Sequence, residues 1–295
     1  MSENYQISKG EVIAPPIKYR SFKRFYANKA AFISLVFIIL FNILCFFPKI
    51  LSRFPQNDIN ENRKRLPISA THWLGTDVLG RDNLTELLYA GQISLKIGLF
   101  VGIISTLLGA VVGAYAGYYG KWIDSILMRM TDLFLCVPTL IMLALALRKF
   151  GDGDISMIFC ISAISWMYAA RLVRSKVLSL KTRDYVDAAK INGRSGFYII
   201  FKHLIPNSFS VIAVNAALTI SAAIGLESTI SFLGFGIQPP LTSWGRMLYD
   251  SKGYAVGKYS YIFLAPAISV FLVILAFNFI SDGLRDALDP RSEQS

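Results

Sequence analysis

Charged residues are scarce in this sequence. Asp, Glu, Lys and Arg make up 17% of the 295 residues, against about 25% in typical soluble domains. Hydrophobic residues make up 54%, which excludes an intrinsically disordered chain because such chains are poor in apolar residues. The three cysteines are too few for a disulfide-stabilised secreted module.

The sequence also lacks the motifs of common catalytic and metal sites. Its two histidines, His72 and His203, lie too far apart for a local metal motif. Neither Gly-Lys pair is followed by the Ser or Thr of a phosphate-binding loop, and no Gly-x-Ser-x-Gly occurs. We therefore predict no catalytic residue and no metal site on this chain. A channel, a structural membrane protein, or the pore subunit of a machine powered elsewhere remain as classes.

The apolar residues are concentrated in long blocks without charge. A helix needs roughly 20 apolar residues to cross about 30 Å of hydrocarbon, and helices are the spanning form that satisfies every backbone polar group within one segment. We therefore predict an all-α integral membrane protein with six transmembrane helices. The six blocks are residues 30–47, 97–119, 133–147, 155–170, 208–226 and 259–281.

The positive charges indicate how the chain is oriented. With six spans both termini lie on the same side, and if that side is the cytoplasm the inner segments hold 18 of the 30 Lys and Arg residues. The positive-inside rule favours this arrangement. The net charge of +11 is then explained by contact with membrane lipid. Because no RNP-like or helix-turn-helix pattern accompanies it, we predict no nucleic-acid partner.

The segment between the fourth and fifth blocks, residues 171–207, is long for a helix connection. Its first part is predicted to form a short helix that ends at Gly193. Asp184 and Asp187 lie near the helix start, where the dipole stabilises acids. The Ala188–Ala189 pair offers a small surface on which another protein can pack. An amphipathic second part is expected to end before Pro206. From these residues alone, a docking loop for a cytoplasmic partner and an amphipathic segment at the membrane interface both remain open.

The pattern Asp187-Ala-Ala-x3-Gly193-x9-His203-x-Ile205-Pro206 resembles the EAA loop of bacterial ABC importer permeases. In that family the loop forms a coupling helix that docks into a groove of the ATPase subunit. The resemblance therefore implies a coupling loop at 184–207. Its site residues are Asp184, Asp187, Ala188, Ala189, Gly193, His203 and Pro206, with Asp187 in place of the usual Glu.

Four further segments are similar to the C-type permease subunit of the dipeptide, oligopeptide and nickel branch of that family. They are residues 72–82, 128–138, 227–245 and 283–291. The resemblance implies the type I ABC importer permease fold in the bacterial inner membrane. It implies a pore subunit without catalysis of its own, which imports dipeptides or oligopeptides. A nickel or other small-solute importer, and a self-sufficient channel, remain as alternatives.

The same resemblance implies the partners and the division of the chain. The partners are a second permease, two cytoplasmic ATPases that bind ATP and Mg²⁺, and an extracytoplasmic peptide-binding protein. The N-terminal segment 1–29 and the tail 284–295 are expected in the cytoplasm. The first transmembrane helix is expected at 30–48, an outer segment at 49–92, and a five-helix core at 93–283.

Polar residues at the fifth block form a weaker set of candidates. Asn215 lies within the block, and Glu227 and Ser228 follow at its end, near the expected outer mouth. We assign all three to the translocation path or an outer gate. The alternative is structural: Asn215, like Asn278 in the sixth block, forms an interhelical hydrogen bond, and Glu227 hydrogen-bonds a break in its helix.

Charged residues on the outer side form a second weaker set. Asp77, Arg81 and Asp82 follow or precede glycines that permit tight turns, and they are able to pair with one another. We interpret them as an outer clamp, with docking of the binding protein as the alternative. Trp244, in the outer loop 234–261, belongs to the same receptor-facing candidate surface.

Glycine and proline predict features of the helices themselves. Gly109, Gly113 and Gly117 recur every four residues and form a smooth stripe for close helix contact. The contact is either internal or with the second permease. Pro138 and Pro266 are expected to kink or locally open their helices.

Overall fold

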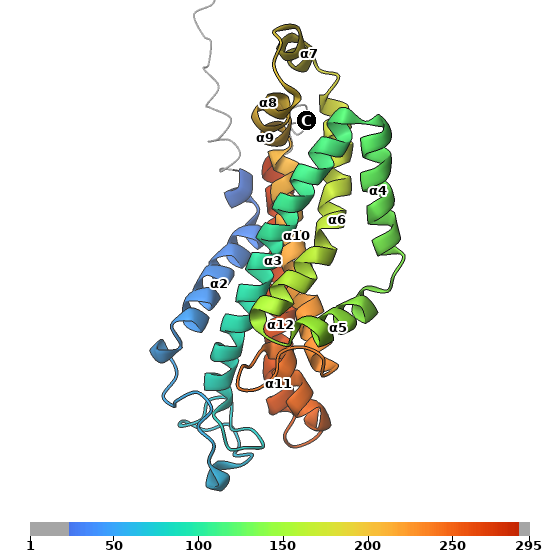
Figure 1. Ribbon diagram of the computed structural model, residues 1–295. Coiled ribbons are helices and arrows are strands. Elements are labelled where there is room, and N and C mark those ends of the chain that lie inside the picture. The colour runs from blue at the N-terminus through green and yellow to red at the C-terminus, as the bar shows by residue number, and fades with distance from the viewer. Residues whose placement is uncertain (1–23, 289–295) are drawn as a thin grey trace, which may run out of the picture.

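The protein is a bundle of α-helices. The computed structural model describes residues 24–288. Residues 1–23 and 289–295, which hold most of the expected N-terminal segment and the end of the expected tail, lie outside the described residues. The long helices of the bundle (Figure 1) are α2 (Lys29–Phe46), α3 (Asn83–Tyr119), α6 (Asp154–Leu180), α10 (Phe209–Phe232) and α12 (Tyr261–Leu288).

Shorter helices connect the long ones. They are α4 (Lys121–Leu135), α5 (Thr139–Phe150), α7 (Asp184–Ile191), α8 (Gly196–Ile199), α9 (Ile205–Asn207) and α11 (Trp244–Ser251). Single 3-10 turns lie at Pro48–Ile50, Glu61–Arg63 and Lys252–Tyr254, and a π-helical turn lies at Ile200–Leu204. Between residues 24 and 288 there is no β-strand.

The five long helices are each apolar and long enough to cross a membrane, and α4 with α5 qualifies as a sixth span only as a pair bent by 89°. The third span, expected at 133–147, is therefore divided between α4 and α5. The break has a local cause, because Pro138 lacks an amide hydrogen and disfavours helical backbone at Val137. The kink expected at Pro138 is confirmed, whereas α12 continues as one helix through Pro266.

Helix α3 lies at the centre of the bundle. It packs mainly against α6 and α10, while α12 packs against α10 and α2. A methyl group at Gly113 would lie 3.0 Å from backbone atoms of Ala170 on α6, and one at Gly117 would meet Val177 at 2.9 Å. The glycine stripe thus brings two helices of this chain together, the internal alternative of the two expected.

Helix α3 begins at Asn83, inside the expected outer segment 49–92. Its first turns are polar yet buried, because the preceding segment covers them. The Asp82 carboxylate caps the helix by accepting from the Thr85 amide at 2.9 Å. The Glu86 carboxylate accepts from the Asn57 amide at 2.7 Å. Hydropathy alone places the helix start too late, because it does not register these polar contacts.

The two ends of the bundle differ in character. The α7 end carries α7, α8 and α9, and the α11 end carries α5, α11 and residues 47–82 (Figure 1). The described chain ends meet toward the α7 end, where Asn28 Nδ2 donates to Asp286 Oδ2 at 3.1 Å. Beside this bond, Phe25, Ala31 and Ala287 form a small buried apolar cluster.

Candidate functional site

Helix α7 projects from one end of the bundle (Figure 1). Its inner face is held by Val186, which is fully buried in an apolar cluster with Val177 of α6 and Leu204. The acids Asp184 and Asp187 lie in the first turn, where the partial positive charge of the helix N-terminus favours them. Val186 is therefore the one fully buried side chain that attaches α7 to the bundle, and most of the remaining surface of α7 is exposed.

The outward surface of α7 is small and mostly uncovered. Asp184, Asp187 and Ala188 are exposed, Ala189 is half-buried, and the side chain of Ile191 is 87% exposed. The exposed isoleucine and the exposed alanine leave a small apolar surface on which another protein can pack. The residues from 184 to 189 that the sequence predicts for coupling are thus brought together on one projecting helix.

Gly193 ends α7 as expected. Its φ of +69° lies in the left-handed region that glycine adopts without steric cost. The amide of Gly193 donates to Lys190 O at 2.9 Å, and the amide of Arg194 donates to Ala189 O at 3.1 Å. This pair of bonds is the Schellman motif, which satisfies the last carbonyl groups of a helix.

The second part of the loop differs from the expectation that it ends before Pro206. The backbone stays helical from Gly196 through α8, the π-helical turn and α9, and Pro206 lies inside α9. The π turn changes the hydrogen-bond register directly before the proline. Side chains also donate to carbonyl groups there: Asn207 Nδ2 donates to His203 O at 2.6 Å, and Ser208 Oγ joins its own amide in donating to Leu204 O, at 2.8 Å.

His203 lies apart from the exposed surface of α7. It is half-buried, with its ring 6.1 Å from that of Tyr185 and 5.6 Å from that of Tyr198. It therefore links the two halves of the loop from the inside. Pro206 is exposed on α9, away from the α7 tip.

Ion pairs and caps connect the loop to the bundle. Arg174 on α6 donates from Nε and Nη2 to the two carboxylate oxygens of Asp124 on α4, both at 2.5 Å. Arg171 pairs with Asp132 one turn away. Lys181, which follows α6, donates to Gly117 O at the end of α3 at 2.9 Å. These contacts join the end of α6, at the base of the loop, to α3 and α4.

The residues assigned to a translocation path are not gathered on one open surface. Glu227 is fully buried, and its carboxylate accepts from Ser94 Oγ of α3 at 2.9 Å and from Ser231 Oγ at 2.8 Å. Ser228 is buried beside it. Glu227 is thus structural, but it ties α10 to α3 and does not bond a break in its helix, because α10 continues to Phe232. A contact with solute requires rearrangement.

Asn215 lies in a different place, toward the α7 end of α10. Its side-chain amide donates to Thr219 Oγ1 of the same helix at 3.2 Å, so the interhelical bond expected for it is wrong. The companion expectation holds for Asn278, whose amide donates from α12 to Ser221 Oγ of α10 at 3.1 Å. Asn215 lines a groove of about 300 Å³ between α6, α10 and α12.

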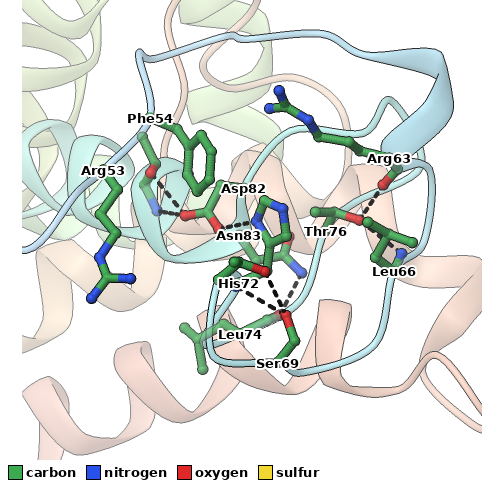
Figure 2. A network of polar contacts seen from close by, with 12 residues as sticks. Arg53, Phe54, Arg63, Leu66, Ser69, His72, Leu74, Thr76, Asp82 and Asn83 are labelled. Atoms are coloured by element: carbon green, nitrogen blue, oxygen red, sulfur yellow. Dashed lines mark hydrogen bonds and ion pairs between the residues drawn. The ribbon is translucent and has the colours of Figure 1, made fainter.

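The outer clamp residues do pair, although not all with one another. Arg81 Nε donates to Asp77 Oδ2 at 2.6 Å, and Asp77 also accepts from the Leu79 and Arg81 amides. Asp82 instead pairs with His72 Nδ1 at 2.8 Å, both side chains being buried (Figure 2). The ring of Phe54 stacks on His72 at 4.7 Å. The clamp thus closes residues 52–82 onto the start of α3.

Trp244 is not on the receptor-facing surface to which the sequence assigned it. Its side chain is fully buried, stacks on Phe41 of α2 at 5.7 Å, and donates from Nε1 to Leu87 O of α3 at 3.0 Å. It fastens α11 to two other helices, because burying its large ring while satisfying its N–H is favourable. The indole is therefore a packing element of the α11 end.

Sequence reasoning missed Ser94, His72 and Glu86. Each becomes important only through a distant partner: Ser94 bonds Glu227, His72 bonds Asp82, and Glu86 bonds the backbone of Asn57. No local motif marks such pairs. Within the described part of the chain, no group of three or more His, Cys, Asp or Glu residues is arranged to hold a metal ion.

Five spanning helices, a broken sixth and a short helix projecting from one end define a multi-pass membrane protein. Residues 109–294 match the family described as binding-protein-dependent transport system inner membrane component. Residues 19–67 match the family of the N-terminal transmembrane domain of oligopeptide transport permease C. The chain belongs to the family of inner membrane components of binding-protein-dependent transport systems.

Relatives cover nearly the whole chain. The dipeptide transport system permease protein DppC of Alkalihalophilus pseudofirmus is 36% identical over 271 residues, which are 92% of this chain and 89% of the relative. The oligopeptide transport system permease protein OppC of Mycobacterium tuberculosis is 38% identical over 272 residues, 92% of this chain and 93% of the relative. The motif-based assignment to this branch of permeases is confirmed.

The fold has a solved counterpart. A chain of the methionine ABC transporter MetNI in its inward-facing conformation superposes with a TM-score of 0.57 at 18% identity, covering 69% of this chain and 96% of the other. The similarity shows that the bundle is that of an ABC transporter permease. The expected fold class is thereby confirmed, with its third span broken.

Proposed function

We propose that this chain is one of two permease subunits of an ATP-driven importer that carries dipeptides and oligopeptides into the cytoplasm. The peptide substrate is supported by the names of the relatives, which are dipeptide and oligopeptide permeases over nearly their full length. In this proposal the α7 end faces the cytoplasm. Both termini then lie in the cytoplasm, residues 49–92 form the outer segment, and residues 284–295 form an inner tail.

The observation that carries the proposal is the form of α7. It combines exposed Asp184, Asp187 and Ala188 with a highly exposed Ile191, and it is attached to the bundle by buried Val186. A separate protein that packs on this tip would bury the exposed isoleucine and alanine. We assign that role to an ATPase subunit, which binds ATP and Mg²⁺ and moves α7 when its nucleotide site closes. The permease itself contributes no catalytic group.

Movement of α7 reaches the spans through named contacts. The bidentate Arg174–Asp124 pair and the Lys181–Gly117 bond connect the base of the loop to α4 and α3. Rigid-body motion of these helices switches access of the path from one side of the membrane to the other. The second permease supplies the other wall of the path, and a peptide-binding protein delivers the solute at the α11 end.

The coupling surface is tested by Ala188→Glu, which places a charged and longer side chain on the bare face of α7. The chain is tagged and purified from its native membrane with accompanying subunits. We expect the variant to insert normally, to lose most of the co-purifying ATPase or its peptide-stimulated activity, and to lose uptake. The matched control is Ala255→Glu, the same change at an exposed position of the α11 end, which should retain the ATPase subunits.

The substrate is tested separately, in proteoliposomes that contain the purified complex and its binding protein. Uptake of labelled dipeptides or longer peptides that depends on ATP supports the proposal. Uptake of Ni²⁺ instead of peptides would contradict the proposed substrate, but it would still support the proposal that the complex is an importer. Conduction by this chain alone, without ATPase subunits, would replace the importer with a self-sufficient channel.

A further inference from the structure

A groove of about 300 Å³ opens between α6, α10 and α12 near the α7 end. It reaches from Ser210, in the first turn of α10, to Leu218, a depth of about 12 Å at 1.5 Å per helical residue. Its long wall is aliphatic, formed by Val211, Val214 and Leu218. The groove therefore begins at the α7 end of α10 and follows the first turns of that helix as an apolar slot.

Two cations stand at the mouth of this groove. Lys176 lies in the last turns of α6, and Arg285 lies in the last turn of α12. Neither side chain has a carboxylate partner among residues 24–288, although the nearby arginines Arg171 and Arg174 are both paired with aspartates. Asp286, the residue after Arg285 on α12, accepts a hydrogen bond from Asn28. The residues that line the groove thus include two cations and no carboxylate.

The aliphatic wall and the two cations together indicate which kind of molecule binds in the groove. A peptide in the slot would bury amide groups against aliphatic walls, and unpaired amides in apolar surroundings cost free energy. The polar side chains available along the groove are those of Ser210 and Asn215, and the Asn215 amide already donates to Thr219. An acyl chain needs no hydrogen bonds, and basic pockets between spanning helices at the cytoplasmic side bind anionic headgroups.

We propose that this groove is a binding site for an anionic phospholipid, with the phosphate between Lys176 and Arg285 and one acyl chain along Val211, Val214 and Leu218. The site joins α6, which leads into the coupling loop, to α10 and α12. A lipid held there contacts three helices at once and stabilises their packing. The proposal rests on the proposed orientation, with the α7 end at the cytoplasmic side, and does not depend on which solute is carried.

The site is tested on the full chain, purified from its native membrane in mild detergent with whatever subunits accompany it. Phospholipids that remain bound are extracted and quantified by mass spectrometry. We expect about one molecule of phosphatidylglycerol or another anionic phospholipid to remain bound to each chain. The double variant Lys176→Gln with Arg285→Gln should lower retention tenfold or more, on the basis of the contribution of each cation near an anionic headgroup.

The matched control removes two other cations of the same end, Arg129→Gln with Lys202→Gln, whose side chains are exposed and outside the groove. This control should retain the lipid. A second variant, Val214→Phe, fills the slot without changing charge and should also lose the lipid, which separates acyl binding from general attraction of anions. Normal thermal stability of each variant shows that a loss of lipid does not reflect misfolding.

Three results would overturn the proposal. Equal retention of phosphatidylcholine and phosphatidylglycerol would show that the two cations select nothing. Equal loss in the groove variant and the control would reduce the effect to net charge. Recovery of a peptide or of a helix of another subunit in the groove, identified by cross-linking from position 214, would assign it to a different occupant.

Discussion

The carboxylate of Glu227 on α10 and the hydroxyl of Ser94 on α3 are joined by a 2.9 Å hydrogen bond in the fully buried part of the bundle. The same hydroxyl accepts from the backbone amide of Trp244 at 3.2 Å, so three helices converge on one serine. Satisfied networks of this kind rigidify a core, whereas a partly satisfied one is costly. The acid therefore holds α3, α10 and α11 in a single arrangement at the α11 end.

Glu227→Leu should destabilise the protein because it leaves the hydroxyls of Ser94 and Ser231 without their acceptor. Each buried unsatisfied group costs about 1–3 kcal/mol. Glu227→Gln retains an acceptor oxygen of the same size and should lose less. Thermal unfolding of the purified chain in detergent measures both. If the two variants melt together at the temperature of the unchanged protein, the network does not contribute to stability.

Gly113→Val should disrupt the contact of α3 with α6, because the added Cβ would lie 3.0 Å from the Cα and carbonyl carbon of Ala170. Backbone atoms cannot yield as a flexible side chain does, so we expect a loss of about 1–3 kcal/mol or more and poor accumulation in the membrane. Gly225→Ala is the control, since its Cβ meets only Ile274 Cδ1 at 3.6 Å. Similar stability of the two variants would contradict the packing role.

Asp82→Ala should release the outer clamp. The substitution removes the N-cap of α3, worth about 0.5–2 kcal/mol, and the partner of buried His72. Limited proteolysis of residues 49–82 should become faster by severalfold. The control is Asp58→Ala, which breaks a half-exposed pair with Arg63 of a kind that contributes about 0–1 kcal/mol. Unchanged cleavage of the Asp82 variant would show that the clamp is held by other contacts.

Gly193→Pro should separate ATP hydrolysis from transport. Proline fixes φ near −65° and has no amide hydrogen, whereas position 193 has a φ of +69° and donates to Lys190 O. The end of α7 would be redirected, and peptide-stimulated uptake should fall to background. Gly193→Asn is the companion change, because asparagine tolerates the left-handed region. Uptake that is preserved in the proline variant would mean that the end of α7 has no role in coupling.

Much of the candidate site could be predicted from local sequence. Asp184, Asp187 and Gly193 mark the start and the end of a short helix by dipole and backbone rules that need no tertiary context, and α7 lies where they place it. The exposure of Ala188 and Ile191 could not be derived in this way. It depends on Val186 alone being buried against α6 and the following helix.

Local sequence was enough to predict a helical membrane bundle, because a helix satisfies every backbone polar group of a long apolar run within that one segment. The break at Pro138 could also be predicted locally, because proline lacks the amide hydrogen that a continuous helix needs. The tertiary structure alone decided that Glu227 and Trp244 are buried and that α3 begins at Asn83. These depend on hydrogen-bond partners up to 157 positions away, and polar groups gain their position from such partners and not from their neighbours in the chain.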